Sequence, residues 1–160
     1  MTKAKFAQFT VALVLGLGCG PAPTEATVRL SELPLAEGPS ADGLSAFRVG
    51  SVRFYSDTAR IEAPDRAALG EPVDLYVSTY GGGCVAPDTT VATMQATRVT
   101  IVPYQRVGTN PALACPAILR IEHRRVRVAF GTAGTVTVRV VGREEPSGRL
   151  FAVERRIIVR

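Results

Sequence analysis

Short runs in which apolar and polar residues alternate dominate the chain from residue 47 onward. The stretch VDLYV places Val73, Leu75 and Val77 on one side of an extended chain, and Asp74 and Tyr76 on the other. Gly, Pro and Asp residues interrupt such runs roughly every ten residues, which is the spacing of turns between strands. Because each strand has one apolar face, the pattern predicts an all-β domain of antiparallel sheets.

Two later stretches repeat the alternation. The apolar residues expected to face the core there are Val136, Val138 and Val140 in TVTVRVV, and Phe151, Val153, Ile157 and Val159 in FAVERRIIV. The strands expected over the whole chain cover residues 48–56, 59–63, 72–80, 89–96, 98–104, 117–121, 126–130, 135–142 and 150–159. Some seven to nine such strands with regular turns predict a sandwich of two sheets.

One segment breaks the alternation. Leu119 and Ile121 would face the core from odd positions, whereas the apolar residues between Val126 and Phe130 would face it from even positions. A regular strand cannot do both, because its side chains alternate strictly between two faces. We therefore expect a bulge or a tight turn at residues 122–125, the stretch EHRR.

The order of these stretches resembles bacterial immunoglobulin-like domains. Residues 59–84 hold a short strand, a proline-containing crossover, Gly70 and an amphipathic strand, which resembles the opening of such domains. Residues 130–144 resemble a later strand, and the final RIIVR resembles the closing one. The resemblance covers residues 48–160 in pattern and implies an immunoglobulin-like antiparallel β-sandwich. It implies no ligand, since such modules host many functions.

An apolar ramp near the N-terminus ends at a cysteine. Lys3, Lys5 and the mostly apolar residues 6–18 have the charge and length of a signal peptide, and the ramp is too short to span a bilayer. The small residues leading into Cys19 resemble the lipobox of bacterial lipoproteins. That resemblance implies cleavage after residue 18 and a lipid on the Cys19 thiol, which anchors the protein to a membrane. A plain signal peptide with an incidental cysteine is the alternative.

The residue after the cysteine and the stretch that follows predict where the domain lies. Gly20, in place of aspartate, implies the outer membrane by resemblance to the lipoprotein sorting rule, so we expect the protein to face the periplasm or the cell surface. Residues 20–46 contain four prolines and no aromatic residue. This composition predicts that residues 19–46 form a lipidated, flexible tether and that the domain begins at residue 47.

Charge is unevenly distributed along the chain. Without residues 1–18, seventeen Arg and no Lys stand against fourteen acidic residues, for a net charge of +3. We attribute the absence of Lys to a GC-rich genome and expect no nucleic-acid binding. Residues 19–97 are acidic, whereas residues 98–160 hold twelve Arg and four Glu. Such asymmetry can attract an anionic partner, and it can equally serve cross-strand ion pairs.

The basic half contains one candidate ligand site. Arg125 and Arg127 alternate with apolar neighbours, so they should share an exposed sheet face, and Arg139 from a neighbouring strand could extend this patch. An anionic surface such as lipid A phosphates or an acidic glycan would suit it. The alternative is that these arginines pair across strands with acids such as Asp74 or Glu154 and bind nothing.

The two remaining cysteines lie in loop-like stretches, Cys84 after YGGG and Cys115 within NPALACP. In an exported chain they predict a disulfide, and the glycines before Cys84 would let the backbone bring it to its partner. A metal site with His123 is the alternative, but neither cysteine has a ligand two to four residues away, as zinc sites require. We expect no metal and no cofactor.

No catalytic motif accompanies the single histidine, His123. A general base needs a nucleophile and an orienting acid, and the sequence offers neither a nucleophile elbow nor a zinc-protease motif. We therefore expect a noncatalytic envelope module that binds a protein or glycan or serves a structural role. The alternative is a β-sheet carrier of a lipid or small hydrophobic molecule, which would need a hollow core.

Overall fold

The structure is a computed structural model that describes residues 24–27, 33–39, 45–58, 61–110, 112 and 114–160. The expected signal peptide and Cys19 lie outside these residues. The described chain is all-β and contains no helix, as the sequence predicts. Accordingly, no described helix offers the length and apolar character that crossing a membrane requires.

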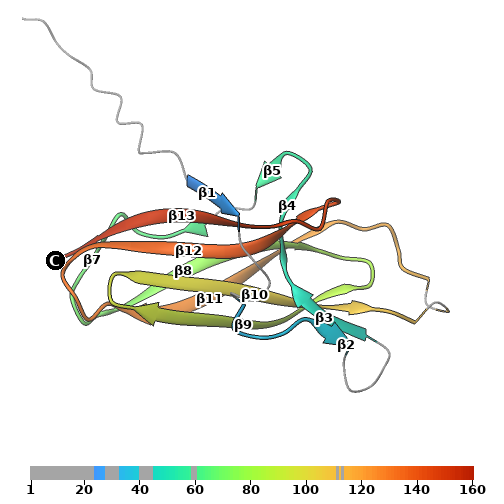
Figure 1. The fold of residues 1–160 in the computed structure, drawn as a ribbon, viewed down its shortest axis with the longest axis horizontal. Helices are drawn as coiled ribbons and strands as arrows, with labels where there is room; N and C mark the ends of the chain where they lie inside the picture. The colour runs from blue at the N-terminus through green and yellow to red at the C-terminus, as the bar shows by residue number, and fades with distance from the viewer. Residues whose placement is uncertain (1–23, 28–32, 40–44, 59–60, 111, 113) are drawn as a thin grey trace, which may run out of the picture.

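Within the described residues the strands are β1 (Thr24–Thr27), β2 (Gly38–Pro39), β3 (Ser45–Val49), β4 (Ser51–Phe54), β5 (Asp57–Thr58), β6 (Ile61–Glu62), β7 (Arg66–Ala67), β8 (Pro72–Gly81), β9 (Val85–Gln95), β10 (Arg98–Gly108), β11 (Arg120–Ala129), β12 (Gly134–Glu145) and β13 (Leu150–Val159). The six strands β8 to β13 are long, with 10 to 12 residues each, and lie side by side along the length of the molecule (Figure 1).

These strands form one curled sheet with the order β11-β8-β4-β12-β10-β3-β2, to which β13 adds beside β12 and β9 beside β10. The sheet is mixed, because β10 and β4 run parallel to β12, and β7 runs parallel to β13. The expectation of purely antiparallel sheets is therefore wrong. Side-chain alternation reports which face of a strand is buried, and it carries no information on the direction of the neighbouring strand.

The main core lies between β8 and β11 on one side and β10, β12 and β13 on the other. Leu75 and Val77 of β8 are almost fully buried there, together with Val138 of β12 and Ile157 of β13. The inward faces expected for these strands are thus confirmed. A second cluster, built around Tyr104, covers the opposite face of β10 and β12. The central strands β10 and β12 are therefore apolar on both faces, as is usual for strands that are covered by other layers on both sides.

The segment before residue 47 contributes to this second layer. The Tyr104 hydroxyl donates to the Leu35 carbonyl and accepts from the Leu35 amide, both at 3.0 Å. Glu37 accepts two 2.6 Å hydrogen bonds from Arg143, and β1 pairs with β13. These described residues pack against the domain, whereas the sequence predicts a flexible tether as far as residue 46. Their partners lie roughly 70 to 130 residues later in the chain, so local composition could not reveal them.

The break in alternation at residues 119–130 does not produce a bulge or a tight turn. β11 pairs with β8 without interruption from Arg120 opposite Gly81 to Ala129 opposite Pro72, so the bulge expected at residues 122–125 is wrong. Even positions face inward throughout the strand, and Ile121, at an odd position, is 54% exposed. Leu119, before the strand, is also exposed. The expectation that both face the core is wrong, because Glu122 and Arg124 take the inner positions at this end of β11.

Candidate functional site

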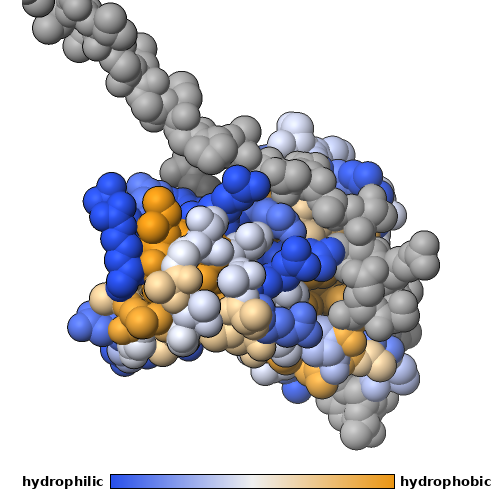
Figure 2. Space-filling view, turned by 60° about the vertical axis from the view of Figure 1, so that its left-hand side comes forward, coloured by the Kyte–Doolittle hydropathy of each residue, from blue (hydrophilic) through white to orange (hydrophobic). Residues whose placement is uncertain are grey.

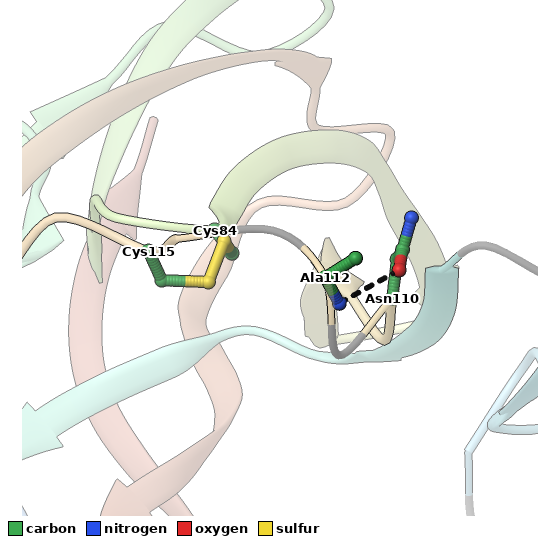
Figure 3. The surroundings of a disulfide bond; sticks show 4 residues. All are labelled: Cys84, Asn110, Ala112 and Cys115. Atoms are coloured by element: carbon green, nitrogen blue, oxygen red, sulfur yellow. Dashed lines mark hydrogen bonds between the residues drawn. A yellow bond between two sulfur atoms is a disulfide. The ribbon is translucent and has the colours of Figure 1, made fainter.

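A disulfide joins Cys84 to Cys115, as the sequence predicts, with the two Cα atoms 5.1 Å apart. Figure 3 shows the bond between the turn that precedes β9 and the connection from β10 to β11. In that connection the Asn110 side-chain oxygen accepts a 2.9 Å hydrogen bond from the Ala112 amide. The disulfide therefore fastens the long β10–β11 connection to the β8–β9 turn.

The glycines of the β8–β9 turn allow the connection to pass close by. A Cβ atom on Gly82 would collide with the Ile118 carbonyl oxygen, and one on Gly83 would lie 2.7 Å from the Pro116 carbonyl oxygen. Both glycines also have positive φ angles, +108° and +60°, which residues with a side chain rarely adopt. The glycine run thus serves a close backbone contact as well as the turn that leads to Cys84.

The contact between these two segments forms one wall of an open groove with a volume of about 430 Å³. We call it the end groove, because it lies at one end of the strands. The volume falls within the range of small-ligand sites, which are mostly apolar with a few polar groups. Its lining residues are Arg48, Ser51, Phe54, Tyr80, Gly81, Gly82, Val85, Pro116, Ala117, Ile118, Leu119, Glu145 and Pro146.

The polar groups of the end groove are held in place by one another. Glu145 accepts a 3.0 Å hydrogen bond from the Ser51 hydroxyl, and the same oxygen lies 3.1 Å from Nη2 of Arg48. Behind them the fully buried Gln105 accepts from the Ser51 amide and donates to the Tyr80 carbonyl. These residues could not be identified from the sequence, because they come from five strands and no motif links them.

The rim of the end groove is apolar and exposed. Ile118 and Leu119 line the groove and are 48% and 54% exposed, and Ile121, which is 54% exposed, follows beside this rim on β11. Figure 2 brings forward the opposite end of the molecule, which holds the C-terminus, and there hydrophobic residues reach the surface in small groups separated by hydrophilic ones. Scattered single hydrophobic residues are ordinary, whereas neighbouring ones mark interaction surfaces. The break in alternation was the sequence signal for this rim.

Arg125 and Arg127 share the exposed outer face of β11, as expected. Both contact one carboxylate, that of Asp74 on β8, at 2.7 Å and 3.7 Å. The hydrogen bond from Arg125 lowers the pKa of Asp74 and raises the pKa of Arg125 itself. The cross-strand pairing with Asp74 that the sequence analysis left open is thus present, and both side chains remain more than half exposed.

Arg139 does not join this pair. It lies on β12, which does not pair with β11, and its Nε lies 3.8 Å from Glu154 on β13. The structure therefore brings together Arg125 and Arg127 and leaves Arg139 on another part of the sheet. The cross-strand pairing with Glu154 follows from the register of β12 with β13, where the two residues lie opposite one another.

Arg124 is a structural residue that the sequence analysis did not single out. It faces inward, and its guanidinium donates to the carbonyls of Asp88 and Tyr104 at 2.8 Å and 3.2 Å. Burial lowers its pKa, because desolvation disfavours the charged form. Its even position, in phase with Val126, was the signal that could have identified it.

His123 lies on the outer face of β11, and its Nδ1 is 3.0 Å from the Ser78 hydroxyl on β8. No group of three or more potential metal ligands occurs among the described residues. No protein-family model matches the chain, and no curated protein or solved structure matches it. The end groove and the outer face of β11 are therefore the candidate binding surfaces of the described residues.

Proposed function

We propose that the protein is a lipid-anchored component of the bacterial cell envelope whose domain is a noncatalytic, immunoglobulin-like module that binds a partner protein. The observation that carries the proposal is the exposed apolar rim of the end groove, Ile118 and Leu119, with the exposed Ile121 beside it and a disulfide in the adjoining wall. A preorganised apolar surface loses little conformational entropy on binding. The immunoglobulin-like part is supported by the packing of β8 and β11 over β10, β12 and β13.

A binding role suits the polar end of the groove. Arg48 and Glu145 pair with each other, so the groove presents hydrogen-bonding groups without a net charge. A noncatalytic module needs such fixed groups to orient a partner, and the surrounding apolar wall provides the buried area. A partner side chain could therefore enter the groove while the rim packs against the partner's surface.

Site-specific photocrosslinking in cells tests the proposal. A photoreactive residue at Leu119 should crosslink to one defined envelope protein, whereas the same residue at Leu69, which is 49% exposed near the C-terminus, should not. Adding Ile118→Asp should abolish the Leu119 crosslink. Crosslinks that form equally from both positions, or that survive Ile118→Asp, would contradict a binding role for the rim.

The anchor is tested separately. Labelled palmitate should enter the protein, and Cys19→Ser should release it from the outer-membrane fraction. This part of the proposal rests on the resemblance of the residues before Cys19 to a lipobox. A serine variant that still fractionates with the membrane would refute the lipid anchor and leave the role of the rim untouched.

A carrier of a small hydrophobic molecule is the second candidate, favoured by the volume and apolar walls of the end groove. An environment-sensitive apolar dye should then bind with one-to-one stoichiometry and be displaced by extracted envelope lipids. Filling the groove with Gly81→Leu should block the dye. Dye binding that is unchanged in this variant would exclude the carrier function.

A further inference from the structure

The outer face of β11 changes from apolar to basic along its length. Ile121 lies beside the rim of the end groove, and Arg125 and Arg127 follow on the same face. At roughly 3.3 Å per residue, the distance along the strand from Ile121 to Arg127 is about 20 Å. An extended segment of seven residues would therefore span both regions.

β11 is an edge strand. Within the described chain it forms a ladder with β8 alone. Its contact with β9 on the other side runs through the Arg124 side chain, so the backbone N–H and C=O groups of that side have no strand partner. Natural proteins protect such edges with charge, and the three exposed arginines of β11, Arg120, Arg125 and Arg127, would repel a second copy of this strand. The same charges would accept a strand that carries acidic side chains.

The charges on this face are incompletely neutralised. The single carboxylate of Asp74 serves two guanidinium groups, and the one from Arg127 lies 3.7 Å away. The side chains of Arg125 and Arg127 are 56% and 65% exposed, against 29% for Asp74. One positive charge in excess therefore stands at the surface beside the unpaired edge.

We propose that an extended acidic segment of the partner protein adds to the free edge of β11 as a further strand. Its acidic side chains lie beside Arg125 and Arg127, and its apolar side chains lie beside Ile121 and the rim of the end groove. Backbone hydrogen bonds provide affinity in this mode, and alternate side chains provide specificity. The inference rests on the proposed binding function, because it names the partner chemistry for the same surface.

Synthetic peptides test the inference on the full-length chain. The probe has nine residues, with glutamate at positions one and three, valine at seven, leucine at nine and threonine elsewhere. The reversed sequence covers the parallel direction of addition. Either peptide should shift the backbone amide resonances of β11 more than those of β9, a second long edge strand.

Two matched changes assign the contacts. Replacing both glutamates with lysine should weaken binding about tenfold, because opposite charges across strands attract and like charges repel. The protein variant Arg125→Glu/Arg127→Glu should reverse this preference. The control Arg106→Glu changes an arginine that is 55% exposed and also pairs with an aspartate, and it should leave peptide binding unchanged.

N-methylation of alternate peptide residues removes the backbone donors that strand addition needs. Such a peptide should lose binding, and equal binding would overturn strand addition. Binding of neither peptide would overturn the inference as well, while a defined crosslink from Leu119 would still support the proposed function. Arginine-dependent retention on anionic vesicles without peptide binding would assign the face to a membrane and also overturn it.

Discussion

Nη1 of Arg124 donates a 2.8 Å hydrogen bond to the carbonyl oxygen of Asp88, and so joins two strands, β11 and β9, that do not pair with each other. A second hydrogen bond reaches the carbonyl of Tyr104 on β10. One side chain thereby spans the open side of the curled sheet. The next residue, Arg125, points to the other face, where it pairs with Asp74.

This difference between neighbouring arginines predicts different effects on stability. Arg124→Ala should lower the free energy of unfolding by about 1–3 kcal/mol, since it leaves carbonyl groups without their donors. Arg125→Ala should lower it much less, because an exposed ion pair contributes little. Urea denaturation of both variants measures the two changes, and equal losses would contradict the structural role of Arg124.

The pKa of Asp74 should respond to Arg125. In the folded protein this pKa lies below its ordinary value of 3.8, mainly because Arg125 donates a hydrogen bond to the carboxylate. The ion pair therefore stabilises the fold above about pH 4, and its contribution is lost as the pH falls through the folded-state pKa. An NMR titration of the Asp74 carboxyl carbon should show a higher pKa in Arg125→Ala. The control variant Arg106→Ala should leave the pKa of Asp74 unchanged.

Removal of the disulfide should destabilise the domain. The bond closes a separation of 31 residues, for which loop-closure entropy gives about 3.5 kcal/mol. Cys84→Ser/Cys115→Ser should therefore lower the melting temperature by about 10 °C. Mass analysis of the native protein under non-reducing conditions should show the two cysteines joined, and two titratable thiols in the native protein would refute the bond.

Gly82→Ala should disturb the end groove more than it disturbs the core. The added methyl group would collide with the Ile118 carbonyl and occupy a positive φ angle, so the wall of the groove must move. The matched change Gly131→Ala meets open space and should be tolerated. Amide exchange at Ile118 and Leu119 measures the effect, and similar exchange in both variants would show that the close contact is unimportant.

Much of the fold could be predicted from the sequence, because local alternation identifies strands and their buried faces. Val138 and Leu75 face the core as the pattern indicates. The parallel pairing of β10 with β12 could not be predicted, since it depends on which strands meet in space. The hydrogen bond between the Tyr104 hydroxyl and the Leu35 carbonyl could not be predicted for the same reason, since composition alone predicted a tether.

The candidate site was predictable only in part. The disulfide could be predicted from two cysteines in a chain that was expected to be exported. The break in alternation identified the segment that forms the exposed apolar surface, but the bulge that it suggested is absent. A bulge would have buried Leu119 and Ile121, whereas the chain leaves both at the surface. Arg48 and Glu145 meet across 97 positions of sequence, and no local pattern could indicate that contact.

The position of β1 beside β13 sets an order on folding. Thr24 lies opposite Glu154, and Glu37 accepts hydrogen bonds from Arg143, so part of the N-terminal segment finds its partners in the last two strands. A chain emerging N-terminus first therefore cannot complete either layer until its C-terminal residues are available. Contacts this distant in sequence form slowly. In the envelope location that we propose, this late completion would suit an export channel, which takes an unfolded polypeptide.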